Sequence, residues 1–146
     1  MRWPPEITVA AIVPRNQDFL MVEELSQGQT VINQPAGHLE PDESLADAVI
    51  REVLEETAYL TRPEAIIGLY QYESEAADTL YFRICFLCRV VEKTNRPLDP
   101  DIQAAIWLSA EEIKEKPQRS PLVERCLLDY LEGQRFPLSL YQEIIV

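Results

Sequence analysis

The sequence GHLEPDESLADAVIREVLEETAY, residues 37–59, concentrates acidic residues at a spacing that suits one face of a helix. It holds seven of the 25 acidic residues of the chain, and Arg51 is its only lysine or arginine. At about 100° per residue, Glu52, Glu55 and Glu56 fall within an arc of roughly 100° on a helix over residues 44–57. Three carboxylates therefore share one face of the predicted helix.

The other side of this helix is apolar. Its apolar residues fill a separate arc of roughly 140°, about the width of the stripe that a helix buries in a globular protein. They are Ala46, Val49, Ile50, Val53 and Leu54. Asp42 or Ser44 is expected to cap the helix N-terminus, with Asp47 completing a weak capping-box pattern after Ser44.

The clustered carboxylates predict a divalent cation. Like charges three or four residues apart each cost roughly 0.2–0.5 kcal/mol on a helix, so the three glutamates oppose folding unless a cation offsets them. Carboxylate oxygens suit Mg²⁺, whose coordination is typically completed by waters and substrate phosphates. The preceding run NQPAGH, residues 33–38, is rich in turn-forming residues, and Gly37 allows close backbone approach to a ligand. The pattern predicts a magnesium site for phosphate chemistry, with Mn²⁺ as an alternative ion.

The spacing of this segment resembles the signature of the Nudix hydrolases. Gly37 is followed after five residues by Glu43 and, after seven more, by REVLEETAY, residues 51–59. The departure is Ala58, where the family has glycine at the turn that leaves the helix. A side chain in a left-handed helix cap costs roughly 1 kcal/mol relative to glycine. The resemblance extends to bacterial phosphatases of the family through residues 7–10, 33–39, 109–113, 119–123 and 133–135.

The resemblance implies roles for the residues of this segment. The implied metal ligands are the Gly37 carbonyl, Glu52, Glu55 and Glu56, with Asp101 as a weaker candidate from a loop over residues 92–101 that also holds Asp99. Arg51 would orient the glutamates through charge-assisted hydrogen bonds, and Glu43 would be a supporting carboxylate. Glu52 is the first choice for a general base, although metal binding alone could also generate the hydroxide.

The rest of the chain alternates predicted strands and helices without an internal repeat. Strands are predicted over residues 7–13, 19–24, 30–33, 65–72, 80–91 and 102–108, the first two forming a hairpin. One short helix is expected after Ser109, and a longer one from Pro121 to near Gly133. This order predicts an α/β (α+β) fold with a mixed sheet. The resemblance implies the Nudix α/β/α sandwich, with residues 37–59 as loop-helix-loop and residues 1–146 as a single domain.

Composition limits the classes of protein that fit. A net charge of -12 and a pI near 4.5 argue against a nucleic-acid or anionic-membrane binder. Three cysteines and the lack of a signal-peptide pattern favour a reduced, cytoplasmic protein. Cys85 and Cys88 have CxxC spacing but lie in an apolar strand, where alternation puts them on opposite faces. We expect a monomer that acts on a small phosphoanhydride substrate.

The substrate is less constrained than the reaction. The resemblance implies a phosphatase that releases phosphate from nucleoside tri- and diphosphates and from thiamine-pathway pyrimidine diphosphates. Arg83 and Arg119 are candidates for phosphate contacts, and Tyr72, Tyr81 or Trp107 for stacking on a base, although strand positions of these types are more often surface charge or core. The alternatives are a nucleotide-sanitising pyrophosphohydrolase that releases pyrophosphate and a Nudix-fold module that binds without turnover.

Overall fold

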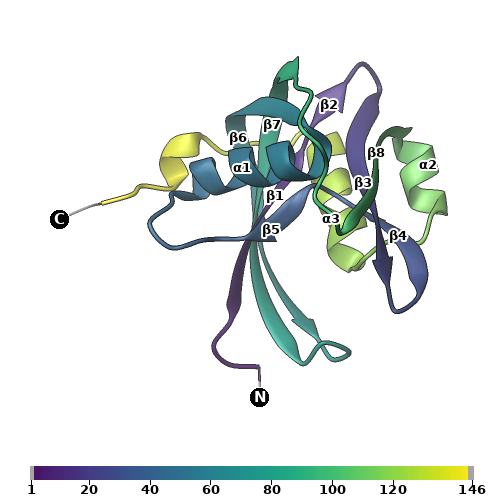
Figure 1. The fold of residues 1–146 in the computed structure, drawn as a ribbon. Coiled ribbons are helices and arrows are strands. Elements are labelled where there is room, and N and C mark those ends of the chain that lie inside the picture. The colour runs from purple at the N-terminus through teal and green to yellow at the C-terminus, as the bar shows by residue number, and fades with distance from the viewer. Residues whose placement is uncertain (1, 145–146) are drawn as a thin grey trace.

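Two four-stranded sheets and three α-helices make up residues 2–144, the part of the chain that this computed structural model describes (Figure 1). The first sheet has the strand order β5-β1-β7-β6, and in the second sheet β3 pairs with β2, β4 and β8. The strands are β1 (Glu6–Ile12), β2 (Pro14–Arg15), β3 (Asp18–Ser26), β4 (Gln29–Asn33), β5 (Ala36–His38), β6 (Tyr59–Ser74), β7 (Thr79–Lys93) and β8 (Ile102–Ser109). The helices are α1 (Leu45–Thr57), α2 (Ala110–Glu115) and α3 (Pro121–Leu131), followed by the short 3-10 helix η1 (Leu138–Leu140).

Helix α1 begins and ends where the local sequence predicts. Ser44 is its N-cap, and the Ser44 hydroxyl accepts a hydrogen bond from the Asp47 backbone N–H at 3.0 Å. Ala58 ends the helix in the left-handed conformation, with φ 67° and ψ 8°, and its N–H donates to the Leu54 carbonyl at 2.9 Å. The helix exit therefore keeps the conformation that favours glycine, although alanine occupies it.

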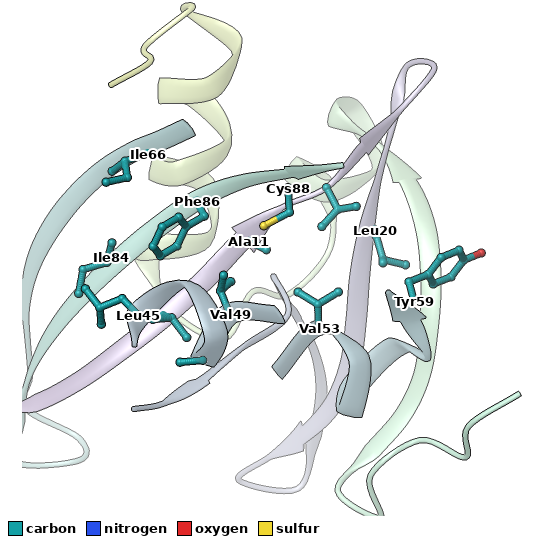
Figure 2. Close-up of a cluster of buried hydrophobic side chains, with 13 residues drawn as sticks. Ala11, Leu20, Leu45, Val49, Val53, Tyr59, Ile66, Ile84, Phe86 and Cys88 are labelled. Carbon is teal, nitrogen blue, oxygen red and sulfur yellow. The ribbon is translucent and has the colours of Figure 1, made fainter. Parts of the chain in front are cut away.

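The buried face of α1 packs on one face of the first sheet, as Figure 2 shows. Alternating residues of the central strands divide between the two faces. Val9 and Ala11 lie in the core under α1, whereas Ala10 and Ile12 lie in a second core that α3 and the second sheet cover. The face of α1 that carries the glutamates is thereby turned away from both cores. Three residues of the predicted apolar arc, Ala46, Ile50 and Leu54, are only partly buried. The buried residues of α1 that the arc left out are Leu45, Ala48 and Thr57.

The predicted mixed sheet is confirmed, because β1 pairs in parallel with β7 and antiparallel with β5. The predicted hairpin of residues 7–13 with 19–24 is wrong. Only β2 turns back on β3, through the pairs Pro14↔Phe19 and Arg15↔Asp18, and β1 lies in the other sheet. Five consecutive residues of β1 are buried, which suits a central strand covered on both faces rather than one arm of a hairpin.

Two further features position the site. The run expected to be a turn before α1 contains strand β5, which pairs with β1 through Val9↔Gly37 and so fixes Gly37 beside the helix. Strands β6 and β7 form a long hairpin that projects beyond the body of the protein (Figure 1). None of the helices in residues 2–144 is long and apolar enough to cross a membrane.

Candidate active site

Gly37 and Glu52 are in such close proximity that no side chain fits between them. Gly37 lies in β5, and a Cβ atom added to it would meet the carboxyl group of Glu52 well inside the roughly 3.5 Å at which two carbon atoms rest. The position of the Glu52 carboxylate, and not a turn, is therefore the reason for glycine at residue 37. The close approach holds the Glu52 carboxylate against the backbone of β5.

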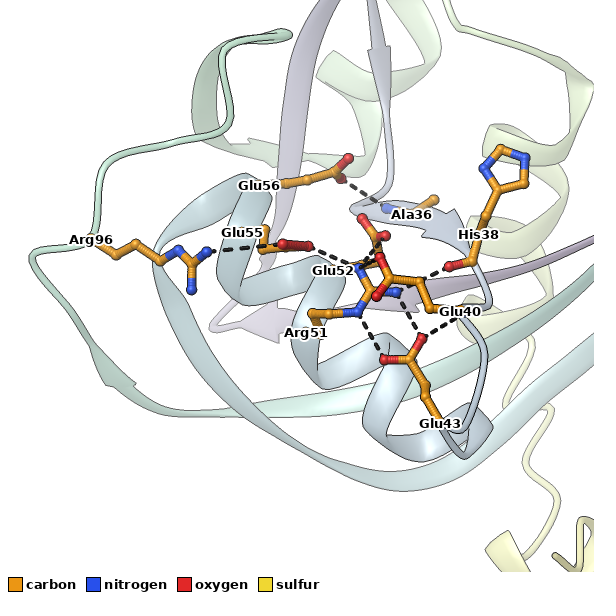
Figure 3. Close-up of polar contacts among 9 residues, drawn as sticks. All are labelled: Ala36, His38, Glu40, Glu43, Arg51, Glu52, Glu55, Glu56 and Arg96. Atoms are coloured by element: carbon orange, nitrogen blue, oxygen red, sulfur yellow. Dashed lines mark hydrogen bonds and ion pairs between the residues drawn. The ribbon is translucent and has the colours of Figure 1, made fainter.

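Arg51 donates hydrogen bonds to three carboxylates and forms an ion pair with a fourth, that of Glu40, at 3.4 Å (Figure 3). Its Nε and Nη2 donate to the two oxygens of Glu43, both at 2.8 Å, which is the bidentate arrangement that guanidinium groups favour. Its Nη1 donates to Glu52 Oε1 at 2.7 Å and to Glu55 Oε1 at 2.8 Å. Nη2 also donates to the His38 carbonyl at 3.0 Å, which ties α1 to the end of β5.

The carboxylates of α1 have different electrostatic environments. The hydrogen bonds from Arg51 hold the pKa of Glu43 below its usual range. Burial raises the pKa of Glu52, although Arg51 opposes that shift. Burial also raises the pKa of Glu56 to about 9, because the single hydrogen bond from the Ala36 N–H, at 2.9 Å, does not offset the loss of hydration and the neighbouring negative charges. No cationic side chain of residues 2–144 pairs with Glu56, and the raised pKa means that the group keeps a proton at neutral pH unless a bound cation displaces it.

A cleft of about 650 Å³ opens beside these carboxylates. Of the residues that the sequence singled out, it is lined by Gly37, Glu52, Glu56, Tyr72, Tyr81, Arg83, Asp99, Asp101 and Arg119. Arg51, Glu43 and Glu55 lie outside this lining and contact it through Glu52. Glu55 is held instead by Arg51 and, at 3.9 Å, by Arg96.

Sequence reasoning missed Glu24, a carboxylate of β3 that lines the same cleft. Glu24 Oε1 accepts from Arg119 Nη1 at 2.8 Å, and its charge is among those that raise the pKa of Glu56. Nothing local in the sequence marks Glu24, because the register of β3 against its neighbours brings it to the site. Asp99, noted beside Asp101, also lines the cleft, and its backbone N–H donates to the Glu55 carbonyl at 3.0 Å.

The candidates for stacking and phosphate contacts lie in different surroundings. Trp107, one of the three stacking candidates, is not among the residues that line the cleft; its Nε1 donates to the Tyr59 hydroxyl at 3.2 Å and Arg15 lies 3.8 Å from its ring centroid, in keeping with the alternative that a strand aromatic belongs to the packing. Tyr72 does line the cleft and stacks on Tyr81 with ring centroids 6.3 Å apart. Arg83 is not a surface charge, since its relative exposure is only 6%.

The oxygen atoms that face the cleft are of the kind that bind a hard divalent cation. Within residues 2–144, no three side chains of histidine, cysteine, aspartate or glutamate converge closely enough to enclose a metal ion by themselves. The side chains that face the cleft near Gly37 nevertheless offer oxygen donors, which Mg²⁺ and Mn²⁺ prefer, and none of the described lysine or arginine side chains pairs with the buried Glu56 carboxyl group. Backbone carbonyls and substrate phosphates commonly supply the other ligands of such an ion.

The chain matches one known protein family over most of its length. The NUDIX domain model matches residues 4–126 of the chain. The chain belongs to the Nudix family. Proteins of the Nudix hydrolase family generally use divalent metals, in agreement with the oxygen donors of the cleft.

Sequence similarity to known phosphatases and hydrolases extends along almost the whole chain. It is 40% identical to Phosphatase NudJ of Escherichia coli strain K12 and 41% identical to that of Shigella boydii serotype 4, in each case over 138 residues, 93% of this chain and 90% of the relative. A solved NUDIX hydrolase from Nitrosomonas europaea has a TM-score of 0.93 and 42% identity, covering 96% of this chain and 97% of its own. The expectation of a Nudix hydrolase that acts on phosphoanhydride bonds is confirmed at this level.

Proposed function

We propose that this Nudix protein is a Mg²⁺-dependent phosphatase that releases orthophosphate from nucleoside tri- and diphosphates and from thiamine-pathway pyrimidine diphosphates. The observation that carries the proposal is that Gly37, Glu52 and Glu56 line one cleft, while Arg51 donates hydrogen bonds to Glu52 and to Glu55 of the same helix. The likeness to phosphatases called NudJ supports orthophosphate as the product.

The proposed roles divide the site into ligands and positioning residues. The ligands of the metal would be the Gly37 carbonyl, Glu52, Glu55 and Glu56, with Asp101 as a further candidate. Glu55 is bound to Arg51 and lies outside the cleft lining, so its participation requires a rotation of its side chain. Arg51 and Glu43 keep the Glu52 carboxylate in place, because the Arg51 guanidinium bridges both carboxylates.

The proposed reaction is attack of water on a phosphorus atom of the anhydride. The water oxygen forms a bond to phosphorus, the bridging P–O bond breaks, and its electron pair leaves on the bridging oxygen. Glu52 is the proposed general base that takes the proton of the water, since it is held between Arg51 and β5 at the edge of the cleft. When bound, a divalent ion would supply charge neutralisation and a lowered pKa for water.

The far side of the cleft is the proposed place of the organic part of the substrate. Tyr72 lines it with Tyr81, and the flat faces of these rings suit an aromatic heterocycle. Arg119 lies 46% exposed at the cleft and is paired with Glu24, so we propose that it contacts the substrate from the rim.

We further propose that the 146-residue chain forms one Nudix domain that acts as a monomer in the cytoplasm on a small-molecule substrate. The part beyond the family match supports the single domain, because Phe136 exchanges backbone hydrogen bonds with Ile66 of β6 at 2.8 and 2.9 Å. The net charge of -12 supports a partner that is neither nucleic acid nor an anionic membrane.

Product identity tests the proposal. The protein would be incubated with nucleoside di- and triphosphates and thiamine-type diphosphates, with Mg²⁺ or with chelator, and orthophosphate and pyrophosphate would be measured separately. We expect orthophosphate, only with Mg²⁺, and at least about 100-fold less of it from Glu52→Gln. Pyrophosphate as the product would instead indicate a nucleotide-sanitising pyrophosphohydrolase. No turnover of any substrate would refute catalysis and favour a binding module.

A further inference from the structure

Arg83 is a buried cation at the inner side of the cleft, and no carboxylate of residues 2–144 pairs with it. It lies on β7, has a relative exposure of 6% and lines the cleft. Its contacts are both made by Nη1, to Gln34 Oε1 at 3.2 Å and to the Cys126 Sγ at 4.0 Å, the second of which is weak. Its Nε is buried and has no hydrogen-bond partner.

This arrangement is costly for the protein alone. A guanidinium group carries five N–H donors and a permanent charge, and a buried charge is normally paired with an opposite charge. Arg119, the other arginine of the cleft lining, has such a partner in Glu24 at 2.8 Å. Within residues 2–144, no carboxylate pairs with Arg83 in this way. An anion that enters the cleft would give Arg83 the ionic partner that these residues do not supply.

The first turn of α3 lies at the same end of the cleft. Ser120 and Leu122 belong to the cleft lining at the N-terminus of this 11-residue helix, where the helix dipole favours negative charge. Gln34 links the two features, because its Nε2 donates to the Val123 carbonyl at 2.8 Å while its Oε1 accepts from Arg83. Arg83 is thus held in place by a neutral and fully buried amide, which leaves its charge for a ligand.

The register of the strands places Arg83 within reach of the glutamates beside Gly37. Thr8 of β1 lies opposite both His38 of β5 and Arg83 of β7. Two strand spacings separate these neighbours, so the backbone at Arg83 is about 10 Å from that at His38, next to Gly37. A diphosphate or triphosphate chain together with the Arg83 side chain can bridge this distance.

We propose that Arg83 and the first turn of α3 bind the free terminal phosphate of the substrate and thereby select substrates that end in an unesterified phosphate. The inference rests on the proposed phosphatase function and adds a specificity determinant to it. A terminal phosphate with a second pKa near 6 carries up to two negative charges, whereas an esterified phosphate carries one and lacks a free end. Cleavage of the terminal anhydride would release the group held at Arg83 as orthophosphate.

The test compares binding of two non-hydrolysable ligands in the presence of Mg²⁺. One is the α,β-methylene analogue of ADP, and the other is the same molecule with its terminal phosphonate capped as a methyl ester. We expect wild type to prefer the uncapped analogue by at least about tenfold in calorimetric Kd, and Arg83→Gln to reduce that preference roughly 10-fold or more, because bonds to charged groups are lost only from the uncapped ligand. Arg89→Gln is the matched control, since Arg89 is on the same strand, outside the cleft, and paired with Glu64.

Two further variants keep the outcome decisive. Arg83→Lys retains the charge without the planar guanidinium group, and it replaces Arg83→Gln in the test if the glutamine variant does not fold. From Arg83→Lys we expect at least a threefold loss of the preference for the uncapped analogue. Cys126→Ser should keep the preference, and a loss equal to that of Arg83→Gln would show that Arg83 serves the thiol, which overturns the inference. Normal orthophosphate release with an unchanged preference in Arg83→Gln would also overturn it. Absence of both turnover and analogue binding in wild type would refute the proposed function itself.

Discussion

Replacement of Gly37 by alanine should separate activity from stability. The new Cβ atom would overlap the Glu52 carboxyl group, which is the far end of a flexible side chain, so the carboxylate is expected to retreat while the strand stays in place. An unstrained carbon–carbon contact requires about 3.5 Å, and the carboxylate must therefore move by roughly 1 Å or more. That movement breaks the 2.7 Å hydrogen bond from Arg51.

The expected magnitudes follow from these contacts. A displacement of about 1 Å in a positioned catalytic group can cost around 100-fold, and we expect kcat to fall by that order. A hydrogen bond to a charged group contributes roughly 1.5–3 kcal/mol, while alanine is favoured over glycine in a strand by about 0.5–1 kcal/mol. The free energy of unfolding should therefore fall by only about 1–2 kcal/mol.

A double-mutant cycle with Glu52→Ala provides the assay. Urea unfolding in chelator gives stability, and orthophosphate release with Mg²⁺ gives kcat. Because Glu52→Ala removes the overlapping group, Gly37→Ala should cost no stability in that background. Gly68→Ala is the matched control, since its Cβ would meet the Tyr70 hydroxyl at 2.6 Å, away from the carboxylates, and it should lose more stability while kcat stays within about threefold. The reasoning is refuted if Gly37→Ala keeps kcat within threefold of wild type, or costs the same stability with and without Glu52.

Three further substitutions test other parts of the site. Glu56→Gln should raise the free energy of unfolding without metal by on the order of 1 kcal/mol at neutral pH, because burial raises the pKa of Glu56 to about 9 and the carboxyl group must take up a proton on folding, which glutamine avoids. The same change should lower kcat about 100-fold; urea unfolding and phosphate release measure both, and lower stability would contradict the assignment. Arg51→Lys should lower kcat by roughly 10- to 100-fold because the ammonium group cannot reproduce the fork on Glu43, and an effect on KM alone would argue against a positioning role. Ala58→Gly should change the free energy of unfolding, measured in urea, by less than about 0.5 kcal/mol. Glycine relieves about 1 kcal/mol of left-handed strain, but the protein loses about 0.8 kcal/mol with the buried methyl group of Ala58. A change above about 1.5 kcal/mol would show that one of these two contributions is wrong.

The helix of the site could be predicted because its signals are local. Ser44 caps it, the apolar and acidic residues separate at helical spacing, and Ala58 occupies the left-handed exit at the position where the sequence pattern expects glycine. Each of these depends on residues within about one turn of one another. The sequence could therefore predict that Glu52, Glu55 and Glu56 belong to one helix, although it could not show that only Glu52 and Glu56 of the three line the cleft.

Other parts of the site depend on contacts between distant segments. The parallel pairing of β1 with β7 joins residues more than 70 positions apart, as in Thr8↔Arg83, and no local pattern specifies that partner. This pairing buries Arg83 and directs it to the cleft, although its position in a strand suggested a surface charge. Glu24 was missed for the same reason, since only the fold of the second sheet brings it near Arg119.

The charges around α1 oppose the stability of the metal-free protein in a specific way. The guanidinium group of Arg51 donates hydrogen bonds to Glu43, Glu52 and Glu55. The buried Glu56 accepts a single hydrogen bond, from the neutral backbone N–H of Ala36. A sequence selected for stability alone would replace Glu56 by a residue that does not ionise, because the protein supplies too little to stabilise its ionised form and the group must bind a proton on folding at neutral pH. The same substitution removes a proposed ligand, so stability gained at Glu56 and activity lost there have one physical cause. Ala58 differs in this respect, because its strain concerns the backbone exit of the helix, and relief of that strain leaves every carboxylate of the cleft in place.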